Sequence, residues 1–410
     1  MTAIDGRPRA GAHLRGASRL AIDATTGLTD LVEAMHARIA TLPGAAPPTE
    51  GRTRGITGLV YRSVRGVTRL VGGSLDALLA LLPASVEGEG GGPRREALVA
   101  ALNGVVGDHL LRSGNPLATP MSLRAHDLAA SAAAVEPAPC RAPDPSRLLV
   151  LVHGLCMNER QWMRQGHHHG LALQRDLGLT PIMLRYNSGL PIADNGAEFA
   201  GHLQRLVDGW PHRIERLVLL GHSMGGLLIR SAFEQGRLAR QPWTQRVSEL
   251  VFLGTPHHGA PLERAGHWLD LVLEGTPYAG PLARIGRVRS AGITDLRQGR
   301  VVADRIDDRR AIHVHVPLPA GVRCLALAAS RGRLDRTLKG RRTGDGLVPL
   351  DSALGRHADP ARCLAFEAGH QWIGAQMNHL DLLSHPEVYT RLRAGLDDQP
   401  GEGVARRRPA

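Results

Sequence analysis

The strongest chemical signal in this sequence is a serine within the segment Gly-His-Ser-Met-Gly at residues 221–225. The apolar run 217–220 precedes it and an amphipathic pattern of helical spacing starts at Met224, so Ser223 falls in a tight turn from a strand into a helix. Such a turn presents the hydroxyl above a sheet, and the flanking glycines let neighbouring backbone approach without Cβ clashes. The pattern predicts that Ser223 is a nucleophile; an ordinary glycine-rich turn is the alternative.

A second signal lies upstream, where the apolar run 148–152 leads into His153, Gly154 and Leu155. A strand that ends in His-Gly gives a loop whose backbone N–H groups can point at a reacting carbonyl oxygen. Acyl transfer needs two such donors held in place, because negative charge collects on that oxygen in the transition state. We predict that the amides of Leu155 and Met224 form this oxyanion site. His153 itself is interpreted as a structural hydrogen-bonding residue.

The segments around these signals alternate between short apolar runs and amphipathic stretches. Near-continuous apolar runs are typical of parallel strands covered on both faces, and their alternation with helices predicts an α/β fold with a mostly parallel, doubly wound sheet. The predicted strands are 148–152, 181–184, 217–220, 250–253, 322–328 and 363–366. The predicted helices in this part of the chain are 160–177, 196–210, 224–237 and 386–396.

These segments resemble the α/β-hydrolase superfamily, and most closely its lipase/esterase branch, which includes bacterial triacylglycerol lipases and GPI inositol-deacylase-like serine hydrolases. The residues that carry the resemblance are 150–154, 221–226 and the Leu-Gly-Thr-Pro-His-His-Gly segment 253–259. The last segment is similar to the Gly-Thr-Pro-x-x-Gly sequence that ends the strand after the nucleophile in that branch. The resemblance covers residues 147–395 and implies a serine hydrolase with the α/β-hydrolase fold.

The family's chain order is nucleophile, acid, histidine, which implies that an acidic side chain lies downstream of Ser223. The segment Gly-Asp-Gly-Leu-Val-Pro at 344–349 is similar to the family's acid-bearing turn. Glycines on both sides let the backbone bend so that the carboxylate points toward the carboxyl edge of the sheet. Asp345 is therefore the predicted acid, with Asp351 and Asp335 as alternatives.

The resemblance also implies a histidine after the last strand, which we predict at 363–366. His370 and His379 both follow it, and we favour His379 because the sequence Met-Asn-His-Leu-Asp around it resembles the family's histidine-bearing loop. In such a triad the imidazole takes the proton of Ser223 and passes it to the leaving group. Asp345 holds the imidazole tautomer without being protonated.

The chain divides at a change of composition near residue 140. Upstream, helical spacing of apolar residues predicts three helices separated by glycine- and proline-rich breaks. A leucine-rich stretch with glycine and proline hinges, at 260–300, lies where family members insert a lid, and an ordinary packed helix pair is the alternative. The predicted organisation is a helical N-terminal region 1–140 with helices at 28–42, 56–82 and 95–111, a linker 141–146, a catalytic domain 147–396 and a flexible tail 397–410.

Composition limits the classes of partner. The formal net charge is 50 − 38 = +12, and a positive field attracts nucleic acid and anionic membrane surfaces alike. Nearly all the basic residues are arginines, with Lys339 as the one lysine, which is typical of codon bias in a GC-rich genome. Aromatic residues make up only 3% of the chain, too few for the base-stacking platforms of single-strand binders. We therefore expect no nucleic-acid partner.

The cysteines and the apolar stretches bear on the compartment. The four cysteines form no CxxC pair, which favours reduced thiols in a cytosolic protein. Residues 1–19 contain four arginines but no apolar stretch follows them, so we expect no secretory signal. The apolar segment 67–86 is interrupted by Arg69 and Asp76 and does not read as a membrane span. We expect a cytoplasmic protein, with peripheral contact to a membrane as a further hypothesis.

We expect no metal and no cofactor. The three consecutive histidines 167–169 would point in different directions from a helix, so a polar, exposed face is favoured over a metal site. His257 and His258 are expected at the rim of a pocket or on the surface.

Two functional hypotheses follow. The first is a carboxylic ester hydrolase that forms an acyl-enzyme on Ser223, with a small-molecule or lipid ester as substrate. The second is a lipid-surface or protein interaction module that carries an inactive hydrolase fold, because the stretch 61–82 mixes arginines with an apolar stripe. The complete set of Ser223, Asp345 and His379 favours the enzyme.

Overall fold

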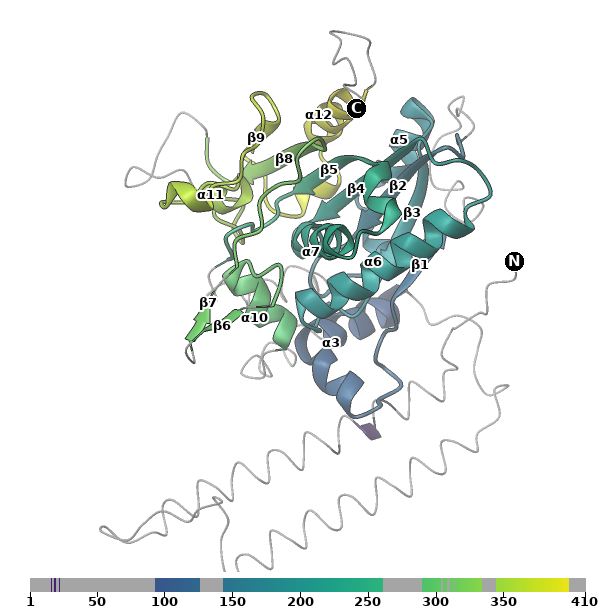
Figure 1. The fold of residues 1–410 in the computed structure, drawn as a ribbon, viewed down its shortest axis with the longest axis vertical. Helices are drawn as coiled ribbons and strands as arrows, with labels where there is room; N and C mark the ends of the chain where they lie inside the picture. The colour runs from purple at the N-terminus through teal and green to yellow at the C-terminus, as the bar shows by residue number, and fades with distance from the viewer. Residues whose placement is uncertain are drawn as a thin grey trace, which may run out of the picture. The chain divides into compact units, whose positions relative to one another are not determined.

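The computed structural model describes most of the chain from residue 93 to residue 397 (Figure 1). Several predicted features lie outside the described residues: the helices 28–42 and 56–82, residues 261–289 of the predicted lid, Asp335 and the tail beyond 397. The described residues are 93–125, 143–260, 290–303, 305–307, 310–312, 314–333 and 344–397, with residues 16, 18, 19 and 22.

A seven-stranded sheet forms the centre of the catalytic segment, with the strand order β1-β3-β2-β4-β5-β8-β9. β1 pairs with β3 in the antiparallel sense and all other neighbours in the sheet are parallel. The bounds are β1 Ser122–Ala125, β2 Arg147–Val152, β3 Thr180–Arg185, β4 Arg216–His222, β5 Val247–Leu253, β8 Arg323–Ser330 and β9 Gln371–Ala375. β6 Arg305–Asp307 and β7 Arg310–Ile312 form a separate antiparallel pair. The predicted mostly parallel α/β sheet is confirmed.

Helices lie on both faces of the sheet (Figure 1). The α-helices are α3 Pro93–Arg112, α5 His169–Leu177, α6 Ile192–Gly209, α7 Met224–Leu238, α10 Ala291–Gln298, α11 Leu350–Ala353 and α12 Pro386–Leu396. The 3-10 helices are η2 Glu159–Trp162, η3 Pro242–Arg246, η5 Pro360–Arg362 and η6 Asp381–Leu383. None of the helices described here combines the length and apolar character needed to cross a bilayer.

Two apolar cores, one on each face, explain why the central strands are mostly apolar. In β2, Leu148 and Val150 pack with α6 and α7 on one face, whereas Leu149 and Leu151 pack with α5 and α12 on the other. Successive side chains of a strand point to opposite faces, so a strand covered on both sides needs apolar residues at every position.

Two predicted elements were wrong. Residues 160–177 do not form one helix, because Gln165 and Gly166 have positive φ angles of 49° and 74° that separate η2 from α5. Residues 363–366 are not a strand; the last strand is β9. β9 lies at the edge of the sheet and most of its side chains are only partly buried, so it lacks the apolar run that revealed the central strands.

The sheet begins earlier than the predicted domain start at residue 147, because β1 adds an edge strand at 122–125. Residues 96–108 of α3 also belong to the compact unit that contains the sheet. The other unit comprises residues 1–95 and 109–119, and within it the Asn115 side chain donates a hydrogen bond of 2.9 Å to the carbonyl of Gly16. The linker and the function of the N-terminal region stay predictions.

Candidate active site

Ser223 lies in the strained turn between β4 and α7. Its φ and ψ are 57° and −123°, a backbone conformation that is costly for a residue with a side chain. The glycines beside it are required by close packing, since a methyl group at Gly225 would overlap the carbonyl oxygen of Val152. The Ser223 amide donates a 2.8 Å hydrogen bond to the carbonyl of Leu253 at the end of β5. The turn therefore packs between the carboxyl ends of β2 and β5.

The predicted oxyanion loop lies directly against this serine. A methyl group at Gly154 would be 3.1 Å from Ser223 Cβ. The amide of Met157 closes the loop on the carbonyl of Gly154 at 3.4 Å. Leu155 and Met224 are both buried, and within the described part of the chain no protein acceptor is bonded to either amide. Both amides are thus available at the carboxyl edge of the sheet, next to Ser223.

Side chains that follow β3 hold the oxyanion loop. Tyr186 donates from its hydroxyl to the carbonyl of His153 at 2.9 Å, and its ring stacks on the His153 ring with centroids 4.4 Å apart. Ser188 Oγ accepts the amide of Cys156 at 3.0 Å. Our sequence analysis did not identify Tyr186 or Ser188; the available signal was the polar run Tyr-Asn-Ser immediately after an apolar strand.

His153 supports the same loop from within. Its Nδ1 lies 2.9 Å from the carbonyl of Gly154, and because a carbonyl only accepts, Nδ1 carries the proton. Burial lowers the pKa of His153 to about 4. The ring is therefore neutral at neutral pH.

Asp345 and His379 form a buried pair. His379 Nδ1 lies 2.6 Å from Asp345 Oδ2. The other carboxylate oxygen, Oδ1, accepts the backbone amides of Leu347 at 2.9 Å and Val348 at 2.8 Å. Both oxygens are therefore occupied, which fixes the carboxylate and, through it, the plane of the imidazole.

His379 meets the serine turn at the end of β5. His222 Nε2 donates to the carbonyl of His379 at 3.2 Å, and the two rings have centroids 4.7 Å apart. A methyl group at Gly254 would be 3.1 Å from two atoms of the His379 ring, and the preceding residue, Leu253, accepts the Ser223 amide. Ser223 Oγ is buried without a hydrogen-bond partner among the described residues. The three predicted side chains thus gather at one edge of the sheet.

The alternative residues lie elsewhere. His370 immediately precedes β9 and is 3.5 Å from Glu367, so it lies at the amino end of a parallel strand whereas Ser223 follows the carboxyl end of another. Asp351 is exposed in the first turn of α11. Among the described residues, no hydrogen bond or ion pair joins either side chain to the serine turn.

From the sequence, we expect the histidines at 167–169 and 257–258 to be exposed or at a pocket rim. This expectation was wrong for His168, His169 and His257, which are buried. His168 caps α5 by accepting the amide of Leu171, and His169 is buried with its Nε2 2.9 Å from the carbonyl of Leu382. His257 is buried, with its ring centroid 4.8 Å from that of Phe252. Among the described residues, no group of three histidine, cysteine or acidic side chains is arranged to hold a metal ion.

A small cavity of about 70 Å³ lies beside the oxyanion loop and the histidine loop. Met157, from the first loop, and Leu380, next to His379, both line it. The remaining lining residues are Gln161, Met163, Arg164 and Leu383.

A family model described as "PGAP1-like alpha/beta domain" matches residues 201–295, which contain the serine turn and β5. No match was found among curated proteins. This match bears out the resemblance predicted from the sequence over residues 201–295, and the mostly parallel sheet agrees with the predicted α/β fold.

Solved structures similar to this chain include a lipase, a thioesterase and an esterase. The mature lipase BlEst2 of Bacillus licheniformis is 19% identical with a TM-score of 0.41, covering 67% of this chain and 99% of that one. The thioesterase RedJ of the prodiginine pathway of Streptomyces coelicolor is 17% identical with a TM-score of 0.38, covering 64% and 96%. The esterase Pf2001 of Pyrococcus furiosus is 12% identical with a TM-score of 0.37, covering 61% and 80%.

Proposed function

We propose that this protein is a serine hydrolase that cleaves carboxylic esters through an acyl-enzyme on Ser223. One observation carries the proposal: the buried Asp345–His379 pair, joined at 2.6 Å, reaches the same edge of the sheet as a serine held at positive φ. An ordinary glycine-rich turn needs neither the strained serine nor a buried carboxylate–imidazole pair beside it.

In the first step, Ser223 Oγ attacks the carbonyl carbon of the ester and His379 Nε2 takes the hydroxyl proton. Asp345 accepts the hydrogen bond from Nδ1 and stabilises the imidazolium. The amides of Leu155 and Met224 donate to the oxygen on which negative charge collects. The tetrahedral intermediate then expels the alcohol, which takes its proton from His379.

In the second step, water attacks the acyl carbon and gives a proton to His379. Collapse of this second tetrahedral intermediate breaks the bond to Ser223 Oγ, and His379 returns the proton to that oxygen. One ester and one water thus become one acid and one alcohol. No metal or cofactor takes part in these steps.

The proposed substrate is a small-molecule or lipid ester with an apolar acyl group. Four of the six residues that line the small cavity are apolar, namely Met157, Met163, Leu380 and Leu383, which favours an apolar group within it. A thioester would be cleaved by the same steps, and RedJ, a thioesterase, is among the structures similar to this chain. A cytoplasmic location and contact with a membrane surface stay predictions.

A fluorophosphonate probe tests the proposal, because it reacts preferentially with an activated serine. We expect wild-type protein to be labelled and Ser223→Ala not to be, with Asp351→Asn as a surface control that keeps full labelling. A panel of p-nitrophenyl esters of increasing acyl length then measures which chain the site accepts. Absence of labelling in wild-type protein would refute the proposal and favour an inactive hydrolase fold.

A further inference from the structure

Helix α3 packs its backbone against the oxyanion loop, although it belongs to a segment that the sequence assigned to a separate N-terminal region. Gly104 is the contact point. A methyl group at Gly104 would overlap Cys156 Sγ and lie 2.8 Å from Cys156 Cα and 2.9 Å from its amide nitrogen. Two of these three atoms are backbone atoms of the residue that follows Leu155, so the loop cannot relieve such a clash by moving a side chain.

A second contact of α3 reaches the residues that hold the loop from β3. Asn187 donates from Nδ2 to the carbonyl of Gly107 at 2.9 Å, and a methyl group at Gly107 would overlap Asn187 Oδ1. Asn187 lies between Tyr186 and Ser188, whose side chains bond the loop at His153 and Cys156. Helix α3 therefore supports the oxyanion loop directly at Gly104, and indirectly at Gly107 through Asn187.

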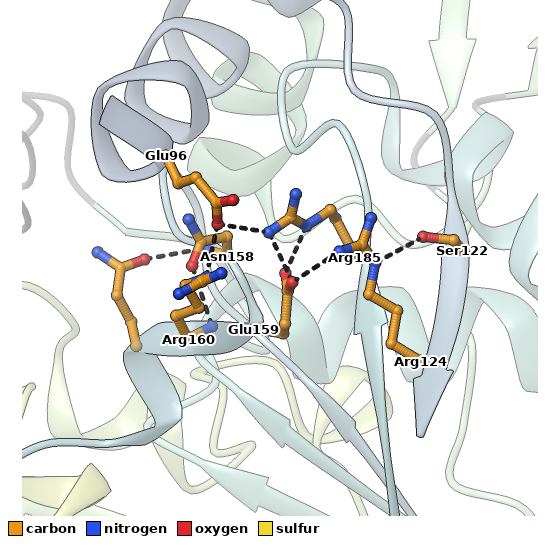
Figure 2. A network of polar contacts seen from close by, with 8 residues as sticks. Glu96, Ser122, Arg124, Asn158, Glu159, Arg160 and Arg185 are labelled. Atoms are coloured by element: carbon orange, nitrogen blue, oxygen red, sulfur yellow. Dashed lines mark hydrogen bonds and ion pairs between the residues drawn. The ribbon is translucent and has the colours of Figure 1, made fainter. Parts of the chain in front are cut away.

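An ion cluster connects the first turn of α3 to the residues just after the loop (Figure 2). Arg185, at the end of β3, bonds Glu159 at 2.6 Å and Glu96 of α3 at 2.9 Å. Arg160 also reaches Glu96 at 2.7 Å, and Arg124 of β1 reaches Glu159 at 3.4 Å. Figure 2 shows the two arginines of β1 and β3 converging on the carboxylate of Glu159.

The charges of this cluster are mutually stabilised. Burial by itself raises the pKa of Glu159, but the hydrogen bonds and charge of Arg185, with that of Arg124, outweigh it and lower the pKa below its usual value. Paired, hydrogen-bonded charges with this geometry are directional. Because Glu159 follows Met157 by two residues, the cluster fixes the downstream end of the loop while Gly104 supports its centre.

We propose that the segment 96–108 of α3 is a positioning element of the oxyanion site, with Gly104 and Glu96 as its positioning residues. This inference rests on the proposed function, since it concerns the placement of the Leu155 amide. Neither residue touches substrate. Each acts by setting where that amide points, and a displacement of about 1 Å of a catalytic group can cost on the order of 10²-fold in rate.

The first test is Gly104→Ala, with Gly201→Ala in α6 as the matched control. Both changes replace a helical glycine and favour the helix, but a methyl group at Gly201 meets nothing closer than 3.5 Å. We expect Gly104→Ala to lower kcat for a p-nitrophenyl ester by about 10- to 100-fold with KM within about twofold. We expect Gly201→Ala to leave both constants unchanged.

Hydrogen exchange provides a readout that does not depend on activity. A peptide covering residues 153–160 should exchange faster in Gly104→Ala than in wild type, and at the wild-type rate in Gly201→Ala. If wild-type protein has no esterase activity but the peptide exchanges faster in Gly104→Ala, the proposed function is refuted and the packing role of α3 stands. Active wild-type protein with unchanged kcat and unchanged exchange in Gly104→Ala would overturn the inference alone.

Glu96→Gln keeps the inference testable if Gly104→Ala fails to fold. The substitution removes one charge from a partly exposed side chain and introduces no clash. We expect kcat to fall by about two- to fivefold, in keeping with the modest contribution of a partly exposed ion pair, with KM unchanged. A kcat equal to that of wild type, or a rise in KM alone, would contradict the role of Glu96.

Discussion

The two sides of the candidate site are held in place in different ways. On the acid side, Asp345 is fixed by the amides of residues two and three positions further along the chain. On the oxyanion side, the loop at 153–157 is held by Tyr186, Ser188 and Gly104, which are far from it in sequence. A local motif therefore specifies the first side, whereas the second depends on the assembly of three segments.

The difference also concerns charge. The acid side contains one buried hydrogen-bonded pair, Asp345 with His379. Beyond the oxyanion loop, two glutamates and three arginines share the cluster drawn in Figure 2. Changes on the acid side should affect the chemical step alone, whereas changes on the oxyanion side should alter both the rate and the stability of the loop.

The largest expected effect is on the acid side. In Asp345→Asn, the amide oxygen can still accept the two backbone amides, but the NH₂ group faces His379 Nδ1 and forces the proton onto Nε2. The imidazole then cannot accept the Ser223 proton, and kcat should fall by about 10⁴-fold with the melting temperature little changed. Steady-state kinetics and thermal unfolding measure the two quantities. A loss of less than about tenfold would contradict the role of Asp345.

The next effect is a loss of stability in acid that originates on the oxyanion side. The pKa of His153 is lowered by burial to about 4, against about 6.5 in an unfolded chain, so protons bind preferentially to the unfolded state between these values. The contribution of His153 to the free energy of unfolding is therefore complete above about pH 6.5, where it totals about 3 kcal/mol. It decreases as the pH falls toward about 4.

Urea unfolding at several pH values measures this dependence in wild type and in His153→Gln, whose side chain does not titrate. We expect a shallower dependence in the variant between pH 6.5 and pH 4. Equal slopes in the two proteins would show that His153 is not the titrating group.

A smaller effect is expected when one long-range bond to the oxyanion loop is removed. In Ser188→Ala the buried amide of Cys156 loses its acceptor, which costs about 1–3 kcal/mol. Because this amide follows Leu155, kcat should fall as well, by about tenfold. Chemical denaturation and kinetics test both effects. A variant with reduced stability but full kcat would show that the oxyanion loop does not need this bond to stay aligned.

The smallest effect is expected at Asp351, the alternative acid. Its side chain is exposed, and exposed substitutions away from specific contacts change stability by about 0.5 kcal/mol or less. Asp351→Asn should retain wild-type kcat within about twofold. A loss comparable to that of Asp345→Asn would reverse the assignment of the acid.

Local motifs were sufficient to predict the central strands and the position of the serine turn. The apolar runs of β2, β4 and β5 follow from burial on both faces, and the glycines around Ser223 follow from backbone contacts within a few ångströms. Asp345 and His379 were chosen by resemblance, and their 2.6 Å contact supports that choice. Their roles in catalysis stay a proposal.

Long-range packing is what the sequence analysis missed. β1 and β9 are edge strands with partly exposed residues, so neither has the apolar run of a central strand. Taken alone, Gly104 is only a residue of low helix propensity within a helix. Its role becomes visible once the loop that packs against it is known. Tyr186 and Ser188 are far in sequence from the residues that they bond, and no regular spacing connects them. Such contacts depend on the assembled fold and leave no local pattern.

The most direct test of the central claim is identification of the residue that a fluorophosphonate probe modifies, by mass spectrometry of digested wild-type protein. We expect one equivalent of label on Ser223, with labelling strongly slowed in Asp345→Asn and His379→Ala. Modification of another residue, or an unlabelled Ser223 in folded wild-type protein, would contradict it.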